Sequence, residues 1–392
     1  MMGDSDQQDE STLVQGGKRK MPKKKKKSWK ERQRERQIKQ ERAQEVYRIR
    51  REREAERKPR RWPKYRILGT VCLLALTLGA YAVWHYTKPF ARPAVVTIYI
   101  RADGSVDPST APILNDKNIY YTFTSAVRGS VVIERDNVVV DGANYALQGS
   151  GNPGSKGVDL TGRGNVTITH IKIKDFEAGV YLSSSWYNVL SQNDLANNVC
   201  SIYLEYSSYN ALSGNDMANN EAGIYLEYSS NNTLGENRIT NNEAGIYLES
   251  SSFNTLSGNR ITNNELYGVL LSSGTDNVLS ENDLTNNEYG IYAQSSTYNL
   301  FSGNVIADNQ RGVYLNESSY NSSYYNNFTD NAEQVYSHAS TSYWDDENSI
   351  GNYWSDYEER YPEAKELDSS GVWNTPYVID ENNQDNFPLV NI

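Results

Sequence analysis

Residues 210–226 read NALSGNDMANNEAGIYL, and residues 232–248 read NTLGENRITNNEAGIYL, 22 residues further on. Comparable segments continue in both directions from Asn232. The leading asparagines are Asn165, Asn188, Asn210, Asn232, Asn254, Asn277, Asn299 and Asn321, spaced by 22 or 23 residues. A fixed period of this length indicates a solenoid, in which each repeat is one structural unit stacked on the next.

The repeats share the pattern N-x-L-S-x-N-x-I-x-N-N-E-x-G-I-Y-L, in which apolar and polar positions alternate in three short stretches. Alternation with a period of two is typical of strands, and asparagine and glycine mark the turns between them. The pattern therefore predicts three strands per coil. The expected fold is all-β, a right-handed parallel β-helix.

Three apolar columns arise when the coils are stacked about 4.8 Å apart. They are Leu190, Leu212, Leu234, Leu256, Leu279 and Phe301; Leu195, Met217, Ile239, Ile261, Leu284, Ile306 and Phe328; and Ile202, Ile224, Ile246, Val269, Ile291, Val313 and Val335. We expect these columns to fill the interior of the tube.

Two further columns suggest how the turns are built. Asparagine recurs at Asn193, Asn215, Asn237, Asn259, Asn282, Asn304 and Asn326, where side-chain amides can hydrogen-bond along the stack. This predicts an asparagine ladder, and counting from Asn165 places His170 in it. Glycine recurs at Gly179, Gly223, Gly245, Gly268, Gly290 and Gly312, where we expect a positive φ or a tight bend. The two 23-residue coils are expected to insert their extra residue before Gly179 and Gly268.

The charge of the chain changes sign at Arg66. Residues 1–66 carry 24 basic and 11 acidic residues, net +13, whereas residues 67–392 carry 15 basic and 38 acidic residues, net −23. Residues 67–86, ILGTVCLLALTLGAYAVWHY, have no charged side chain and are long enough to cross a bilayer as a helix. The basic residues before them indicate a cytoplasmic N-terminus. We predict a single-pass cell-membrane protein with a transmembrane signal anchor at residues 66–86; cleavage after Ala82 is the alternative.

Composition predicts the organisation of the residues that precede the apolar run. Residues 1–27 are predicted to be a disordered basic tail, and residues 28–58 a charged cytoplasmic helix that begins with the capping-box pattern SWKE. The basic charge of this N-terminal segment is explained by membrane topology; anionic lipid headgroups are the alternative partner, and nucleic acid is disfavoured.

The exported part, extracellular or periplasmic, is expected to have three regions. Residues 94–164 form the N-terminal cover and first coils, and residues 165–338 the regular repeats. Residues 339–392 form an aromatic-rich C-terminal cap, because the last coil of a solenoid otherwise exposes its core.

Several motifs resemble those of one known family. The segment NTLSGNRITNN with GIYL, GNYWSDY at residues 351–357 and TPYVIDENNQDNFPL at residues 375–389 resemble NosD-type β-helix proteins. These are also described as carbohydrate-binding and sugar-hydrolase repeats and abound in archaeal surface proteins. The resemblance covers about residues 94–392 and is specific for the fold but weak for activity.

The family name implies copper, which requires clustered His, Met or Cys ligands. The exported part offers His170, His338, Met217 and Cys200, and the columns give His170 and Met217 structural places. Many family members also resemble one another in an Asp-rich calcium-binding stretch before TPYV, but residues 358–374 here lack its alternating carboxylates. We therefore predict no metal and no cofactor.

The outward side of the third strand is the sharpest candidate for function. Tyr203, Tyr225, Tyr247, Tyr292, Tyr314 and Tyr336 form a column there, flanked by Glu205, Glu227 and Glu249. Aromatic faces beside carboxylates suit carbohydrate binding, whereas tyrosines that only cover a sheet face are the structural alternative. A second column, Glu221, Glu243, Glu265 and Glu288, repeats like charge at coil spacing.

These carboxylates are repetitive, whereas catalysis on such a fold needs one cluster of unlike groups. We predict no catalytic residues and a membrane-anchored surface binding or structural module, with glycans or surface-layer components as partners. A polysaccharide-processing enzyme (lyase, hydrolase or epimerase) is the alternative. The N-x-S/T sequons give candidate glycosylation sites at Asn165, Asn231, Asn316, Asn321 and Asn327.

Overall fold

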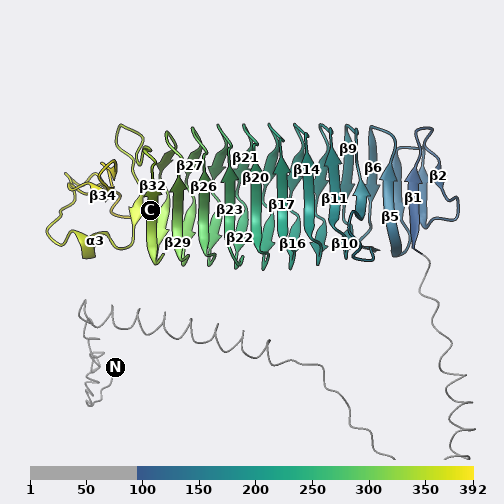
Figure 1. Ribbon diagram of the computed structural model, residues 1–392, viewed down its shortest axis with the longest axis horizontal. Coiled ribbons are helices and arrows are strands. Elements are labelled where there is room, and N and C mark those ends of the chain that lie inside the picture. The colour runs from purple at the N-terminus through teal and green to yellow at the C-terminus, as the bar shows by residue number, and fades with distance from the viewer. Residues whose placement is uncertain (1–94) are drawn as a thin grey trace, which may run out of the picture. The chain divides into compact units, whose positions relative to one another are not determined.

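Residues 95–392, which a computed structural model describes, form a right-handed parallel β-helix of about eleven coils of about 22 residues (Figure 1). This confirms the predicted all-β class and the three strands per coil. The predicted basic tail (1–27), cytoplasmic helix (28–58) and transmembrane segment (66–86) lie outside the described residues. Within residues 95–392, none of the helices has the length and apolar character needed to cross a bilayer.

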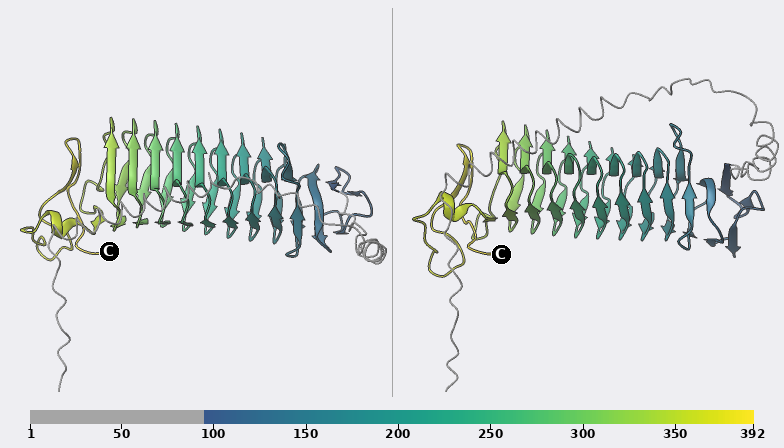
Figure 2. Two further views of the ribbon diagram at one scale, coloured as in Figure 1. Left: turned by 60° about the horizontal axis from the view of Figure 1, so that its bottom comes forward. Right: turned by 90° about the horizontal axis from the view of Figure 1, so that it is seen from below.

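Each coil contributes one strand to each of three sheets, which we call A, B and C. Sheet A contains β1 (Val96–Ile100), β5 (Val127–Ile133), β8 (Lys156–Asp159), β11 (Ala178–Ser183), β14 (Cys200–Glu205), β17 (Ala222–Glu227), β20 (Ala244–Glu249), β23 (Tyr267–Ser272), β26 (Tyr289–Gln294), β29 (Arg311–Asn316) and β32 (Glu333–His338). Sheet B contains β4 (Tyr120–Phe123), β6 (Val138–Asp141), β9 (Val166–Thr169), β12 (Val189–Ser191), β15 (Ala211–Ser213), β18 (Thr233–Gly235), β21 (Thr255–Ser257), β24 (Val278–Ser280), β27 (Leu300–Ser302) and β30 (Ser322–Tyr324). Sheet C contains β7 (Ala146–Gln148), β10 (Lys172–Lys174), β13 (Asp194–Ala196), β16 (Asp216–Ala218), β19 (Arg238–Thr240), β22 (Arg260–Thr262), β25 (Asp283–Thr285), β28 (Val305–Ala307), β31 (Asn327–Thr329) and β33 (Tyr353–Trp354). The strands of neighbouring coils run parallel (Figure 2). They also pair in register, so each position of the repeat forms a straight column along the axis.

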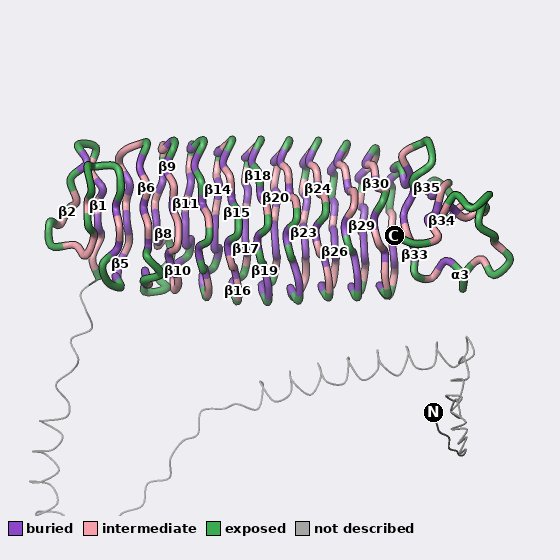
Figure 3. Tube along the Cα trace, turned by 180° about the vertical axis from the view of Figure 1, so that it is seen from behind, coloured by how far each residue is buried: buried purple, intermediate pink, exposed green. Residues whose placement is uncertain are grey.

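The interior of the tube is apolar, as the three predicted columns require. Their residues are fully or almost fully buried, except that Val335 in the last coil is only partly buried. A fourth buried column, which the sequence analysis missed, comes from the second inward position of the sheet A strands: Leu182, Leu204, Leu226, Leu248, Leu271, Ala293 and Leu315. Figure 3 shows the result, with buried positions alternating along the strands and exposed positions gathered at the turns.

Three asparagine ladders, not one, join the coils at their corners. In the predicted ladder, Asn215 Nδ2 donates to Asn237 Oδ1 at 3.0 Å, and Asn215 N donates to the same oxygen at 3.1 Å. The leading asparagines form a second ladder, and a third consists of Asn198, Asn220, Asn242, Asn264, Asn287, Asn309 and Asn331. Because all these amides are buried, the ladders satisfy polar groups that would otherwise be costly inside the fold.

A positive φ, one of the two expected causes, does not explain why glycine recurs in this column. None of its members has a positive φ; instead, the next coil passes close to each of them. A Cβ on Gly223 would lie 2.6 Å from the Gly245 carbonyl oxygen, and one on Gly245 would lie 2.5 Å from that of Gly268. The close approach of adjacent backbones therefore excludes every side chain at this position.

The first predicted repeat is shifted by one residue. Val166 N, not Asn165, donates to the ladder oxygen of Asn188, and Thr167 pairs with Val189 at a spacing of 22. Asn165 has φ 58° and lies at the exposed corner before the ladder. No extra residue therefore precedes Gly179, which corrects that prediction.

The same shift removes His170 from the asparagine ladder. Ile171 N donates to the Asn193 Oδ1, so Ile171 takes the ladder position, and His170, with φ 48°, precedes it. The extra residue before Gly268 is confirmed, because Ala244 pairs with Tyr267 at a spacing of 23.

Both ends of the tube carry additional elements. At the first coil, β2 (Val106–Asp107) pairs antiparallel with β1, and β3 (Ile113–Asp116) pairs antiparallel with β4. At the last coil, α3 (Tyr357–Arg360), β34 (Tyr377–Asp380) and β35 (Asn383–Asp385) follow β33. Phe328 of β31 stacks on the buried Trp354 with a ring centroid distance of 4.3 Å, and Trp354 stacks on Tyr377 at 4.1 Å. These rings continue the apolar core into the C-terminal segment.

Candidate functional site

Sheet A places the predicted tyrosine column on its outer surface. The rings of Tyr203 and Tyr225 stack at a centroid distance of 4.9 Å, and those of Tyr225 and Tyr247 at 4.8 Å. Leu270 interrupts the column, after which Tyr292, Tyr314 and Tyr336 stack at 4.8 and 4.9 Å. We call this surface the sheet A face.

The stacking determines which parts of these rings a ligand can reach. Within each stack the planes are 9–15° apart, so ring faces cover one another along the axis and ring edges point to solvent. The π faces that the sequence analysis offered to a sugar are therefore largely filled by neighbouring tyrosines. Edges and hydroxyl groups remain at the surface.

The predicted glutamates bind those hydroxyl groups. Tyr181 donates to Glu205, Tyr203 to Glu227, and Tyr225 to Glu249, each carboxylate lying one coil beyond its tyrosine. Burial is the main cause that raises the pKa of Tyr203 and Tyr225 above the ordinary value, and the hydrogen bonds to the glutamates add to it. These phenols are therefore hydrogen-bond donors and not bases at neutral pH.

The charged column on the outer side of sheet C is compensated in part by ion pairs between coils. Arg238 pairs with Asp216 at 2.9 Å, and Arg260 with Asp283 at 3.4 Å, along the outer side of sheet C. The second glutamate column, from Glu221 to Glu288, lies at the turn that leads from sheet C to sheet A. The arginines thus neutralise the aspartates of their own column.

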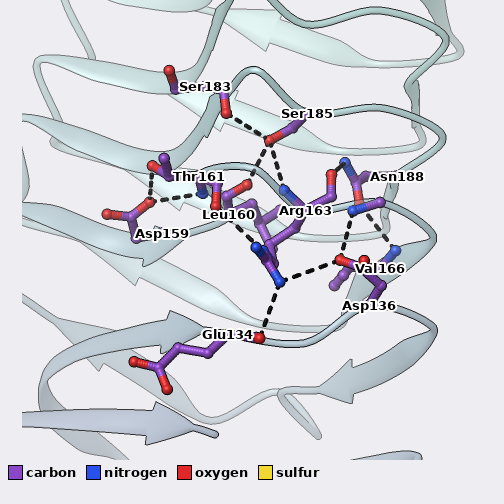
Figure 4. Close-up of polar contacts among 11 residues, drawn as sticks. Glu134, Asp136, Asp159, Leu160, Thr161, Arg163, Val166, Ser183, Ser185 and Asn188 are labelled. Carbon is purple, nitrogen blue, oxygen red and sulfur yellow. Dashed lines mark hydrogen bonds and ion pairs between the residues drawn. The ribbon is translucent and has the colours of Figure 1, made fainter. Parts of the chain in front are cut away.

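A cluster of unlike polar groups, which the sequence analysis missed, lies at the N-terminal end of sheet A (Figure 4). Arg163 Nη1 donates to the Glu134 carbonyl oxygen at 3.0 Å and lies 3.5 Å from the Asp136 carboxylate. Asp159 accepts from Thr161 N at 3.0 Å and Oγ1 at 2.6 Å, and from Lys156 Nζ at 3.1 Å. Glu134, Asp159, Thr161 and Arg163 line a hollow of about 160 Å³.

The signal for this cluster was a break in the columns. Asp159 pairs in register with Tyr181, so it occupies the tyrosine column of the sheet A face. The repeat pattern is recognisable only from Asn165 onward, so the sequence does not reveal an unlike residue in an earlier coil. The repeat carboxylates themselves remain repetitive, and this cluster lies outside the aligned repeats.

The five sequons differ in accessibility. Asn165 and Asn231 are exposed, and Asn316 and Asn327 are partly buried. Asn321 is only 1% exposed, and its amide donates to the Ser296 carbonyl oxygen at 3.0 Å within a ladder. A glycan on Asn321 is incompatible with this fold, which corrects that prediction.

The possible copper donors do not come together. Met217 and Cys200 are buried, and burial raises the pKa of the Cys200 thiol to about 12. His170 lies 3.5 Å from Asp141, whereas His338 is at the end of β32 in the last coil. Among the described residues no group of three or more His, Cys, Asp or Glu side chains could hold a metal ion, so the donor set does not fit copper.

Comparison with known proteins agrees with the fold. A model of the family described as periplasmic copper-binding protein (NosD) matches residues 222–359, and one described as right handed beta helix region matches residues 121–284. A search of curated proteins gave no match.

Several solved structures are similar to this chain at low identity and with TM-scores below 0.5. The periplasmic alginate epimerase AlgG is 19% identical, with 55% of this chain and 58% of that chain covered and a TM-score of 0.46. The A-module of mannuronan C-5 epimerase AlgE6 from Azotobacter vinelandii is 14% identical, with 69% and 94% covered and a TM-score of 0.44. DFA-IIIase from Arthrobacter chlorophenolicus A6 is 12% identical, with 58% and 63% covered and a TM-score of 0.41. The chain thus spans less than two thirds of the alginate epimerase, and these similarities concern the fold alone.

The stacked coils and the asparagine ladders define the class of right-handed β-helix repeat proteins. Within that class, the repeats and the family match identify the chain as a NosD-type β-helix repeat protein.

Proposed function

We propose that this protein is a membrane-anchored surface module that binds a neutral, hydroxyl-rich polysaccharide along the sheet A face. The observation that carries the proposal is the row formed by Tyr203, Tyr225, Glu227 and Glu249, in which hydroxyls and carboxylates repeat in register from coil to coil. A linear polymer with regularly spaced hydroxyl groups can bond to such a row over several coils. Many weak, repeated contacts then add up to binding.

Charge favours a neutral polymer over an acidic one. Residues 67–392 carry a net charge of −23, and the row contributes two glutamates, Glu227 and Glu249. An acidic polysaccharide would be repelled by this surface, whereas sugar hydroxyls can donate to the carboxylates.

The membrane anchor at residues 66–86 and an extracellular or periplasmic location are part of the proposal and rest on the apolar run and the basic residues before it. Surface-layer components carrying glycans are the proposed partners of the β-helix, and anionic lipid headgroups those of residues 28–58. The anchor predicts that the chain sediments with membranes and is released by detergent but not by alkaline carbonate. A chain recovered in the soluble fraction would contradict it.

Binding is tested with the full-length chain in detergent micelles by affinity electrophoresis in gels that contain neutral or acidic polysaccharides. We expect retardation by a neutral polymer and a partial loss of retardation in Tyr225→Ala with Tyr247→Ala. Leu270→Ala, on the same face but outside the tyrosine stacks, is the matched control. Retardation that is unchanged in the tyrosine variant would overturn the proposed face.

The second candidate function is a polysaccharide-processing enzyme, favoured by the unlike groups around Asp159 and Arg163. An enzyme would release new reducing ends or unsaturated products from a polymer and lose this activity in Asp159→Asn. A binding module would retain the polymer without product, and Asp159→Asn would leave its affinity unchanged.

A further inference from the structure

The turn from sheet A to sheet B carries a group of exposed aromatic rings in the coils that contain β11, β14 and β17. Its members, which we call the corner patch, are Trp186, Tyr187, Tyr206, Tyr209 and Tyr228. Between 46% and 58% of each residue is exposed. Exposed aromatic groups gathered at one place mark binding surfaces more often than scattered ones do.

The fold does not require aromatic residues at these corners. Tyr187 and Tyr209 have φ 55° and 59°, a conformation that bulky residues rarely adopt. In the same column, Asn231 with φ 59° fills the identical corner, and asparagine adopts this conformation more readily. The tyrosines are therefore retained at a conformational cost, which points to a role outside folding.

The patch has one open ring face, at Tyr206, whereas Tyr187 stacks on Tyr209 at 5.3 Å. Tyr206 stacks on Tyr228 at 5.2 Å with planes 5° apart, so its other face is turned toward the preceding coil. There the column holds Ser184, a small residue 22 positions earlier, in place of another ring. One aromatic face at the start of this stack is therefore free.

The space beside this face is a hollow of about 390 Å³. Its lining consists of Ser184, Ser185, Trp186, Tyr187, Tyr206, Ser208 and Tyr209. The lining contains hydroxyl groups and aromatic rings and no charged side chain. Ser185 is occupied internally, because its hydroxyl donates to the Leu160 carbonyl oxygen at 2.5 Å (Figure 4), which leaves Ser184 and Ser208 for a ligand.

We propose that the corner patch binds a neutral oligosaccharide, with one sugar ring stacked on Tyr206 in the space above Ser184. The C–H groups on the flat side of a pyranose carry partial positive charge and match the negative face of an aromatic ring. Trp186 and Tyr187 border the same hollow and contact the neighbouring sugar, while the serine hydroxyls bond to sugar hydroxyls. Because the lining has no charged side chain, we expect that binding does not depend on carboxylate or sulfate groups of the sugar.

This site takes the same class of ligand as the proposed function but lies on a different surface, and neither depends on the other. A volume of about 390 Å³ is at the lower end of the range for small-molecule sites. It suits one or two sugar rings, whereas the sheet A face suits a long polymer. Binding of short oligosaccharides therefore reports on the corner patch and distinguishes it from the sheet A face.

The test is isothermal titration calorimetry of the full-length chain in detergent micelles with cellohexaose, mannohexaose and xylohexaose. Tyr206→Ser and Trp186→Ser introduce the residue type found elsewhere in the same columns, at Ser184 and Ser208, so the fold can accommodate them. Phe253→Asn removes another exposed aromatic residue from the Tyr209 column, outside the patch, and is the matched control.

We expect saturable binding of at least one hexasaccharide, weakened about tenfold or more in both patch variants and unchanged in Phe253→Asn, with equal melting temperatures. Failure of all three hexasaccharides to bind, or an equal loss in the control, would overturn the site. If the chain self-associates and Trp186→Ser abolishes this self-association, the corner patch is a protein interface and the proposed sugar site is wrong. If Tyr225→Ala weakens polymer binding while both patch variants bind hexasaccharide normally, the proposed function survives and this inference fails.

Discussion

The hydroxyl of Tyr203 donates to the carboxylate of Glu227, 24 residues further on, and the contact is repeated from Tyr225 to Glu249. Each bond therefore joins one coil to the next on the outer surface, in addition to the backbone ladder. The tyrosine stack and the glutamate row are thus one structure, and a ligand on the sheet A face meets both.

Removing the Tyr203 hydroxyl tests this link. Tyr203→Phe is expected to lower the free energy of unfolding by about 1 kcal/mol, because a partly exposed hydrogen bond to a carboxylate is lost while ring stacking remains. Tyr314→Phe is the control, since the position 24 residues after Tyr314 is His338. Urea denaturation should show a smaller change for Tyr314→Phe; equal changes would mean that Glu227 contributes nothing through this bond.

The asparagine ladders should contribute more to stability than any surface contact. Asn237 Nδ2 donates to Leu212 O and Asn259 Oδ1, both at 2.9 Å, and Asn237 Oδ1 accepts from Asn215. Asn237→Ala leaves several buried partners unsatisfied and is expected to cost about 2–4 kcal/mol. In the same denaturation measurement, Thr233→Ala, at an exposed strand position, should stay within about 0.5 kcal/mol of the parent chain.

Two glycines should differ in how strongly a side chain destabilises the chain. A Cβ on Gly245 would lie 2.4 Å from Ile261 Cγ2 and 2.5 Å from Gly268 O, so Gly245→Ala is expected to destabilise the chain by about 3 kcal/mol or more. Gly258 has φ 63°, and the nearest atom to its Cβ position is Glu236 Cγ at 3.8 Å. Gly258→Asn should therefore cost less than about 1 kcal/mol. Similar melting temperatures for the two variants would refute the close approach of coils at Gly245.

The C-terminal segment should be sensitive to pH through Asp385. Burial raises the pKa of this carboxyl to about 7 from an ordinary value of 3.8, against hydrogen bonds from Asn352 N, Trp354 Nε1 and Phe387 N, and nearby Asp345 adds to the increase. Between about pH 4 and pH 7 the folded chain keeps a proton that the unfolded chain releases. The stabilisation is therefore complete below pH 4 and is lost as the pH rises to 7, with a slope of at most about 1.4 kcal/mol per pH unit.

Asp385→Asn removes this contribution while an amide oxygen can still accept from Trp354. Unfolding followed by tryptophan fluorescence from pH 4.5 to 8 should give a smaller loss of stability with rising pH in Asp385→Asn than in the parent chain. Parallel pH profiles would show that Asp385 titrates near its ordinary value.

The sequence by itself determined the fold class, the coil period and the inward columns, because a solenoid repeats one local environment and therefore repeats its residues. It also identified the tyrosine and glutamate columns of the sheet A face. The sequence did not determine the register of the first repeat. Asn165 and His170 each lie one residue before the ladder position that the repeat pattern predicts for them.

Only the tertiary structure decided which ring faces are free and which polar groups meet. Stacking closes the faces of Tyr203 and Tyr225, whereas Ser184 leaves that of Tyr206 open, and both facts depend on the residue one coil away. Arg163 likewise acquires its partners, the Glu134 carbonyl oxygen and the Asp136 carboxylate, from the preceding coil. Such relationships are distances between residues of different coils. A sequence pattern predicts these distances only when the exact pairing of the strands is known.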